Sequence, residues 1–168
     1  MINTNHRCVP DEPDKTPLPS PENRRVLECS SKGDARFSAF YANVEICKET
    51  KSIEEHYQLA KRFRKGGRIV VPQKVMDAKG KAPINFIVGG EVFDVKDLTS
   101  FYVYLWVKYL DQSPDLVKVL AKYDDYSDMF KGKSINCQAD VIRDYMRDRA
   151  KLVKLHKDFF TRMRFLEQ

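Results

Sequence analysis

The chain has 168 residues and a mass of 19.6 kDa, a length that predicts one domain. Hydrophobic residues make up 42% of the chain and charged residues 32%, a globular composition that excludes wholesale disorder. The 30 Lys and Arg residues outnumber the 24 Asp and Glu residues, giving a net charge of +6. This balance favours a phosphate-bearing partner if the surplus is clustered.

The location and chemistry of the protein are constrained by what the sequence lacks. No apolar run approaches the roughly 18 residues of a membrane span, and the N-terminus has no apolar secretory segment. We therefore expect a cytoplasmic protein that does not bind membranes. The cysteines lack the spacing of a metal site, so we expect free thiols, no metal and no cofactor; they are Cys8, Cys29, Cys47 and Cys137.

The N-terminal segment is rich in proline, with five of the eight prolines in the first 21 residues. Such a segment cannot hold a helix or a sheet interior. We therefore expect residues 1–22 to be a flexible leader and residues 23–168 to be the folded domain. Its first strand is expected over 24–29, followed by a loop that turns at Gly33.

The next part of the chain alternates between short strands and one helix. A strand is expected at 44–47 and a helix over 52–63, with Ser52 as the N-cap and Glu55 completing a capping box. The two glycines at 66 and 67 are expected to break this helix. A strand at 69–71 and a hairpin at 84–95 suggest that residues 66–97 form a β insertion.

The second half of the sequence is predicted to be helical. Aromatic and apolar residues indicate a helix over 98–110, and Pro114 marks the start of another. A polar loop is expected over 123–133 and helix again over 135–165. The fold class is therefore α+β, a mainly helical domain with a small β-sheet or hairpin element.

The basic surplus is concentrated in one segment. Residues 61–81 contain eight Lys and Arg residues against the single acid Asp77. The segment directly follows the predicted helix of 52–63, so we expect nucleic-acid binding there. The candidate binding residues are Arg62, Arg64, Lys65 and Arg68.

Four segments resemble a known family in the expected order. Residues 52–61 are similar to the Ser/Thr-x-Glu signature of the NADAR and riboflavin-pathway N-glycosidase superfamily, with Gln four and Lys seven residues after the Glu. Residues 36–41, 109–116 and 132–136 are similar to its entry strand, its helix pair and its closing loop. The sequence departs from the family at Asp128, which opens a loop without the usual tryptophan, and at the β insertion. The resemblance implies cleavage of an N-glycosidic bond more than it implies a substrate.

The resemblance makes Glu54 the candidate catalytic carboxylate, and chemistry supports that role. Cleavage of a C1′–N bond passes through an oxocarbenium-like state that a carboxylate stabilises while it activates water. Gln58 is expected to orient the sugar or the leaving base, and Lys61 to hold a phosphate or the departing base. A purely structural alternative is that Glu54 favours the helix dipole and Lys61 is a solvated surface cation.

Further candidates come from a loop and from an aromatic cluster. Asp128 is the second candidate catalytic group, with Asn136 and Asp140 as substrate-binding residues, although these are also what a polar surface loop with a helix cap would contain. In the aromatic cluster, Ser38, Phe40 and Tyr41 are expected to bind substrate, the rings by stacking on a base. At this spacing the aromatic rings are also typical of core.

Three functions follow from these residues. The first is a DNA glycosylase that releases a modified base and leaves an abasic site, with a role in defence against phage. The second is a hydrolase that removes ADP-ribose from a guanine base in DNA. The third is a non-catalytic nucleic-acid-binding or inhibitor protein, for which Glu54 would be dispensable.

Overall fold

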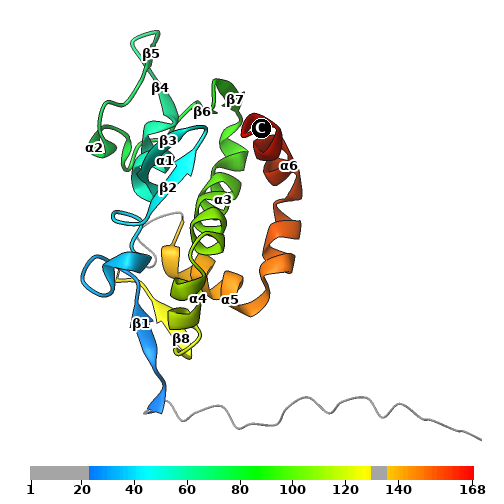
Figure 1. Ribbon diagram of the computed structural model, residues 1–168. Helices are drawn as coiled ribbons and strands as arrows, with labels where there is room; N and C mark the ends of the chain where they lie inside the picture. The colour runs from blue at the N-terminus through cyan, green and yellow to red at the C-terminus, as the bar shows by residue number, and fades with distance from the viewer. Residues whose placement is uncertain (1–22, 130–135) are drawn as a thin grey trace, which may run out of the picture.

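The computed structural model describes residues 23–129 and 136–168, so the expected leader and the segment 130–135 lie outside the described residues. Six α-helices occur in the described part of the chain (Figure 1). They are α1 (Ile53–Leu59), α2 (Val75–Ala78), α3 (Leu98–Asp111), α4 (Pro114–Leu120), α5 (Gln138–Leu155) and α6 (Lys157–Leu166). Two 3-10 turns, η2 (Ala35–Phe37) and η3 (Val95–Asp97), precede β2 and α3.

The strands form three small sheets. One pairs β1 (Val26–Glu28) in parallel with β8 (Asp125–Ser127), and another pairs β2 (Asn43–Ile46) with β3 (Glu49–Ser52) in an antiparallel hairpin. The third is antiparallel with the order β5-β4-β6-β7, formed by β4 (Lys61–Lys65), β5 (Arg68–Val70), β6 (Asn85–Val88) and β7 (Glu91–Phe93). The expected α+β class with small β elements is confirmed.

Helix α3 runs through the middle of the molecule, between α1 with the β2–β3 hairpin and the C-terminal helices α5 and α6 (Figure 1). Its residues Phe101, Leu105 and Trp106 are almost fully buried. Phe86 of β6 stacks on Phe101 with ring centroids 5.4 Å apart. The four-stranded sheet and helix α3 therefore share one apolar core, and this packing fixes the position of β4 relative to α1.

The helix predicted over 52–63 is wrong at its C-terminal end. Helix α1 ends at Leu59, and Lys61 is the first residue of strand β4. Lys61 pairs with Phe86 of β6, and the amide of Ile87 donates to the Ala60 carbonyl at 2.9 Å. These sheet contacts override the helical periodicity of the local sequence. The two glycines, expected to break a helix, form the β4–β5 turn instead.

Two other predictions need correction. The expected polar loop contains strand β8, which the sequence hides because its residues Asp125, Tyr126 and Ser127 become a strand only through pairing with β1. The expected C-terminal helical region is divided at His156 into α5 and α6. No helix in the described part of the chain has the length and apolarity to cross a membrane.

Candidate active site

Glu54 is held at the start of α1 by local hydrogen bonds. Ser52 caps the helix through the Glu55 amide at 3.1 Å, and the Glu55 carboxylate accepts from the Ser52 amide. The Glu54 amide donates to the carbonyl of Ala39 at 2.9 Å. The capping box predicted from the sequence is confirmed, and it places Glu54 beside the segment that contains Ser38, Phe40 and Tyr41.

A chain of hydrogen bonds connects the candidate carboxylate to a buried cation. Gln58 Nε2 donates to Glu54 Oε1 at 3.1 Å, and Lys61 Nζ donates to Gln58 Oε1 at 2.9 Å. Gln58 and Lys61 are each 7% exposed, whereas Glu54 is half-buried. Burial lowers the pKa of Lys61, and the charge of Glu54 partly opposes this shift. The surface-cation alternative for Lys61 is therefore wrong.

Two tyrosines form the wall beside this chain. Lys61 Nζ lies 4.4 Å from the centre of the Tyr57 ring, and the Tyr57 hydroxyl accepts from Asn136 Nδ2 at 2.7 Å. Tyr57 meets Tyr102 edge to face, with ring centroids 5.2 Å apart. Burial raises the pKa values of both tyrosines, so they are neutral hydrogen-bonding groups at neutral pH. The site therefore combines a carboxylate with neutral and cationic donors.

Asp128 and Glu54 share an electrostatic effect on Tyr102. After burial, both carboxylates contribute to the raised pKa of this tyrosine. Asp128 is 9% exposed, and its Oδ2 lies 4.0 Å from the Cys137 Sγ. Glu28 holds the segment around Asp128 by accepting from the Ser127 hydroxyl at 3.1 Å and from the Met129 amide at 3.2 Å.

The predicted substrate-binding residues have different surroundings. Ser38 is fully buried, whereas Phe40 and Tyr41 are 45% and 60% exposed, so these two rings are not core. Lys79 Nζ lies over the Phe40 ring at 5.2 Å. Asp140, at the first turn of α5, forms a 2.8 Å ion pair with Arg143. The structure thus brings Phe40 near Glu54, while the Asp140 carboxylate has a structural partner.

The four predicted nucleic-acid-binding residues divide into two kinds. Arg62 Nη1 donates to the carbonyls of Leu59, Ala60 and Lys61 at 2.9 to 3.0 Å, which satisfies acceptors at the C-terminal end of α1. The other three are exposed on the β4–β5 hairpin; they are Arg64, Lys65 and Arg68.

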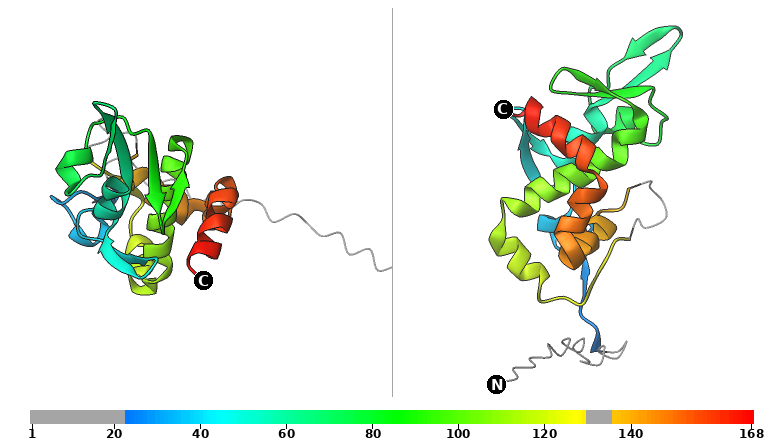
Figure 2. Two further views of the ribbon diagram at one scale, coloured as in Figure 1. Left: turned by 90° about the horizontal axis from the view of Figure 1, so that it is seen from above. Right: turned by 90° about the vertical axis from the view of Figure 1, so that its right-hand side faces the viewer.

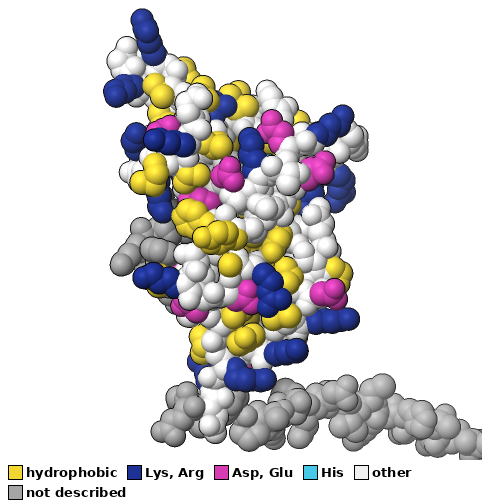
Figure 3. Space-filling model, turned by 60° about the vertical axis from the view of Figure 1, so that its left-hand side comes forward, with side chains coloured by type: hydrophobic (Ala, Val, Ile, Leu, Met, Phe, Trp, Pro, Cys, Tyr) yellow, Lys and Arg dark blue, Asp and Glu magenta, His cyan; other side chains and the backbone are white. Residues whose placement is uncertain are grey.

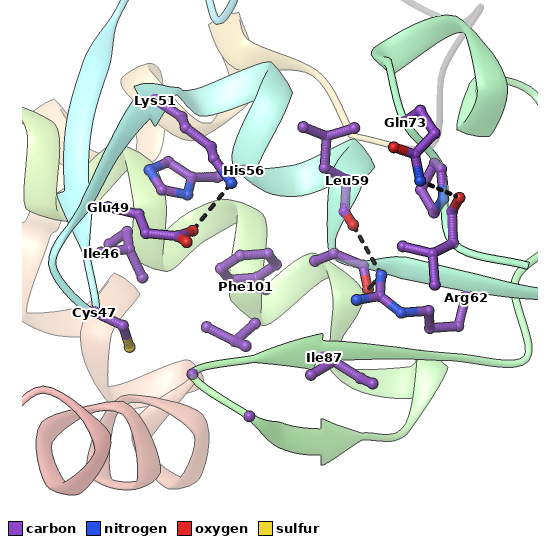
Figure 4. A pocket seen from close by; sticks show the side chains of 16 residues that line it. Ile46, Cys47, Glu49, Lys51, His56, Leu59, Arg62, Gln73, Ile87 and Phe101 are labelled. Carbon is purple, nitrogen blue, oxygen red and sulfur yellow. Dashed lines mark hydrogen bonds and ion pairs between the residues drawn. The ribbon is translucent and has the colours of Figure 1, made fainter.

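A cavity of about 460 Å³ lies on the opposite side of α1 (Figure 4). His56, Leu59 and Arg62 line it, and Glu54, Gln58 and Lys61 do not. The His56 ring is fixed by a 2.7 Å hydrogen bond with the Val44 carbonyl, and burial lowers the pKa of His56. We place the candidate active site at Glu54, because that is where a carboxylate, a buried cation and neutral donors converge.

Sequence reasoning missed Tyr57 and Tyr102 as residues of the site. In the sequence Tyr57 falls on the apolar stripe of its helix, and Tyr102 falls in an aromatic-rich helix. Their hydroxyl groups gain a role only through tertiary neighbours, such as the Asn136 amide on Tyr57. The one signal in the sequence is that Tyr57 stands three positions after the candidate Glu54, a spacing that puts two side chains on neighbouring positions of a helix.

The family comparison shows that this mixed fold is a NADAR-type domain. A family model described as DarT1-associated NADAR antitoxin matches residues 16–161, which is most of the chain. The chain therefore belongs to the family of DarT1-associated NADAR antitoxins. A search among curated proteins found no match.

Proposed function

We propose that the protein is an N-glycosidase that removes ADP-ribose from a guanine base in DNA, and that it acts as an antitoxin by this repair. The observation that carries the proposal is the hydrogen-bonded chain from Glu54 through Gln58 to the buried Lys61. The family match supports it, because an enzyme that restores a base undoes a toxic modification.

The proposed reaction adds water across the bond between C1″ of the ADP-ribose and a guanine nitrogen. Glu54 accepts a proton from the attacking water, and its negative charge stabilises the oxocarbenium-like sugar. The hydroxyl group joins C1″, and the proton taken up by Glu54 passes on to the base nitrogen, directly or through solvent. Free ADP-ribose therefore leaves, and an unmodified guanine remains in the strand. Within this scheme the DNA strand remains intact.

Gln58 gives this carboxylate a defined orientation. Because its Oε1 accepts from Lys61, its amide can turn only Nε2 towards Glu54, and this occupies Glu54 Oε1. The second oxygen, Oε2, forms no hydrogen bond with a described residue and is the one we assign to water. Lys61 supplies a positive charge behind the pair, where it stabilises negative charge on the leaving group and the diphosphate.

The antitoxin family favours removal of ADP-ribose over release of a modified base. A DNA glycosylase would leave an abasic site, which replaces one lesion with another, whereas hydrolysis of an attached ADP-ribose returns the original base. Release of a modified base, a role in phage defence and cytoplasmic location remain predictions. Non-catalytic binding is the contrasting hypothesis, in which Glu54 has no chemical role.

The first test compares two neighbouring glutamates on one helix. An oligonucleotide with ADP-ribose on a guanine is incubated with the wild type, Glu54→Gln and Glu55→Gln, and free ADP-ribose is measured by chromatography. We expect Glu54→Gln to lower kcat about 1000-fold, within the range for loss of a general base. Glu55→Gln removes the same charge but keeps a residue suited to the capping box, so its kcat should stay within about threefold.

The products identify the bond that is broken. Free ADP-ribose together with a strand that resists alkali supports the proposal. Alkali-labile strands with a released base show the glycosylase reaction instead. Equal activity of Glu54→Gln and the wild type, or no product from the wild type, refutes a catalytic role for this site.

A further inference from the structure

The β4–β5 hairpin extends from the body of the protein, as Figure 1 and the right-hand view of Figure 2 show. Its turn residues Gly66 and Gly67 have φ angles of 58° and 77°, and a Cβ atom on either would meet nothing within 4 Å. All residues from 64 to 71 are exposed. An isolated two-stranded hairpin contributes little stability, so packing within the fold does not account for this one.

The outer end of the hairpin is strongly basic. It carries Arg64, Lys65 and Arg68, and no acid occurs between residues 61 and 73. The ion pairs found among residues 23–129 and 136–168 use other cations. Lys and Arg side chains mark this end of the molecule in Figure 3. These three charges are therefore available to an anionic partner.

Strand β4 links this end directly to the candidate active site. Side chains alternate along a strand, so Lys61, Phe63 and Lys65 lie on one face, and the burial of Lys61 and Phe63 agrees with this. Arg68 pairs with Lys65 across the hairpin and shares that face. Four residues at about 3.3 Å each separate Lys65 from Lys61 by roughly 13 Å. That length is within the reach of a short run of nucleotides in a single strand.

Two exposed aromatic residues lie in the segment that is hydrogen-bonded to the start of α1. Phe40 follows directly after Ala39, whose carbonyl accepts the Glu54 amide. Phe40 and Tyr41 present their rings to solvent, with the Lys79 ammonium group above Phe40. Stacking of bases on aromatic rings beside a cationic groove is how proteins hold single-stranded nucleic acid.

We infer that the β4–β5 hairpin is an arm that binds the phosphates of a single DNA strand a few nucleotides from the base at Glu54, with Phe40 and Tyr41 stacking neighbouring bases. The inference rests on the proposed function for the position of the modified base. Binding of unmodified DNA by the arm does not depend on hydrolysis, so the two proposals can fail separately. A protein that pairs with the exposed edge of β5 is the competing occupant.

The test uses a fluorescent, unmodified 20-nucleotide single strand and anisotropy at several salt concentrations. The arm variant is Arg64→Ala/Lys65→Ala/Arg68→Ala. The matched control is Arg147→Ala/Lys151→Ala/Lys154→Ala, which removes three exposed cations from α5. Loss of two to three phosphate contacts should weaken binding at least tenfold and reduce the salt slope by about 1.5 to 2, at about 0.7 per phosphate. The control should change affinity less than threefold.

Several outcomes overturn the inference. These are equal losses in the two triple variants, no measurable binding of the wild type at low salt, and tighter binding of a duplex or of RNA of the same sequence. Phe40→Ala/Tyr41→Ala should weaken single-strand binding by about tenfold or more, and an unchanged affinity refutes the stacking role. Hydrolysis of an ADP-ribosylated mononucleoside should be the same in the arm variant and the wild type. Absence of that hydrolysis in both proteins would instead refute the proposed function.

Discussion

The two ends of strand β4 place the same kind of side chain in opposite environments. Lys61 is buried, donates to Gln58 and lies over an aromatic ring. Lys65, on the same face of the strand, is exposed on a hairpin that contacts little else. A buried amine is held in one position by its neighbours, whereas an exposed amine keeps its rotamer freedom and its hydration.

This difference indicates two roles for the basic segment of residues 61–81. A fixed charge suits chemistry at a defined atom, because no reorganisation is needed as charge develops. A mobile charge suits phosphates, whose positions vary along a flexible strand. The concentration of positive charge in residues 61–81 therefore has two structural explanations, and neither is visible in the net charge alone.

The largest effect expected within strand β4 separates these two lysines directly. Lys61→Met should lower kcat about 100-fold on both an ADP-ribosylated mononucleoside and an oligonucleotide, because a preorganised charge is lost. Lys65→Met, with the same change of side chain, should leave the mononucleoside reaction unchanged. On the oligonucleotide it should raise KM about threefold. Steady-state kinetics on the two substrates measures both effects.

The same pair of variants also differs in stability. Lys61→Met leaves the Gln58 Oε1 acceptor buried without its donor, which costs about 1 to 3 kcal/mol of unfolding free energy. Lys65→Met should change the unfolding free energy by less than about 0.5 kcal/mol, as for most exposed positions. Equal kinetic effects of the two substitutions would contradict the division between chemistry and strand binding.

A smaller effect is expected from the turn of the hairpin. Gly66→Ala/Gly67→Ala forces two residues with side chains to adopt positive φ, at about 1 to 2 kcal/mol each. Because the hairpin packs on little else, we expect it to fray while the melting temperature of the domain is nearly unchanged. Hydrogen exchange of residues 68–70 should accelerate, and affinity for single-stranded DNA should fall about threefold.

Gly66→Asn is the matched control, because asparagine is favoured at this position of a type I′ turn. It should retain both the slow exchange and the affinity. A large fall in the melting temperature of the alanine variant would show that the hairpin supports the fold, and would remove the argument that its role is to bind a partner.

The predictability of these two regions from the sequence also differs. The capping box at Ser52 and Glu55 depends on neighbours in the chain, so the position of Glu54 was correctly predicted. The spacing of Gln58 and Lys61 would put them on one side of a continuous helix, but their proximity in the structure has another origin. It arises from a strand that starts after Leu59, where pairing with β6 ends the helix.

Contacts between distant segments could not be predicted. Strand β8 depends on pairing with β1, about 100 residues away in the chain, and the Tyr57 hydroxyl gains its partner from Asn136. Local patterns also left Phe40 and Tyr41 open between core and binding surface. Only the folded structure shows that these rings are exposed.

The smallest expected effect concerns Glu28, whose hydrogen bonds hold the segment that contains Asp128. Partial burial raises the pKa of this carboxyl group, but hydrogen bonds from Ser30, Met129 and Ser127 outweigh it and lower the pKa overall. A lowered pKa in the folded state adds stability above the ordinary glutamate pKa of about 4.3, and that stability is lost as pH falls through the folded value.

Glu28→Gln should therefore destabilise the protein by about 1 kcal/mol at pH 7, the size of a lost hydrogen bond to a carboxylate. The difference from the wild type should shrink as pH falls from 5 to 3, because the wild-type carboxylate is then protonated in both states. Urea unfolding at several pH values measures the difference. Since Glu28 holds the segment that carries Asp128, kcat should fall while single-strand affinity is unchanged. If the difference in stability does not depend on pH, the charge of Glu28 does not hold the segment that carries Asp128.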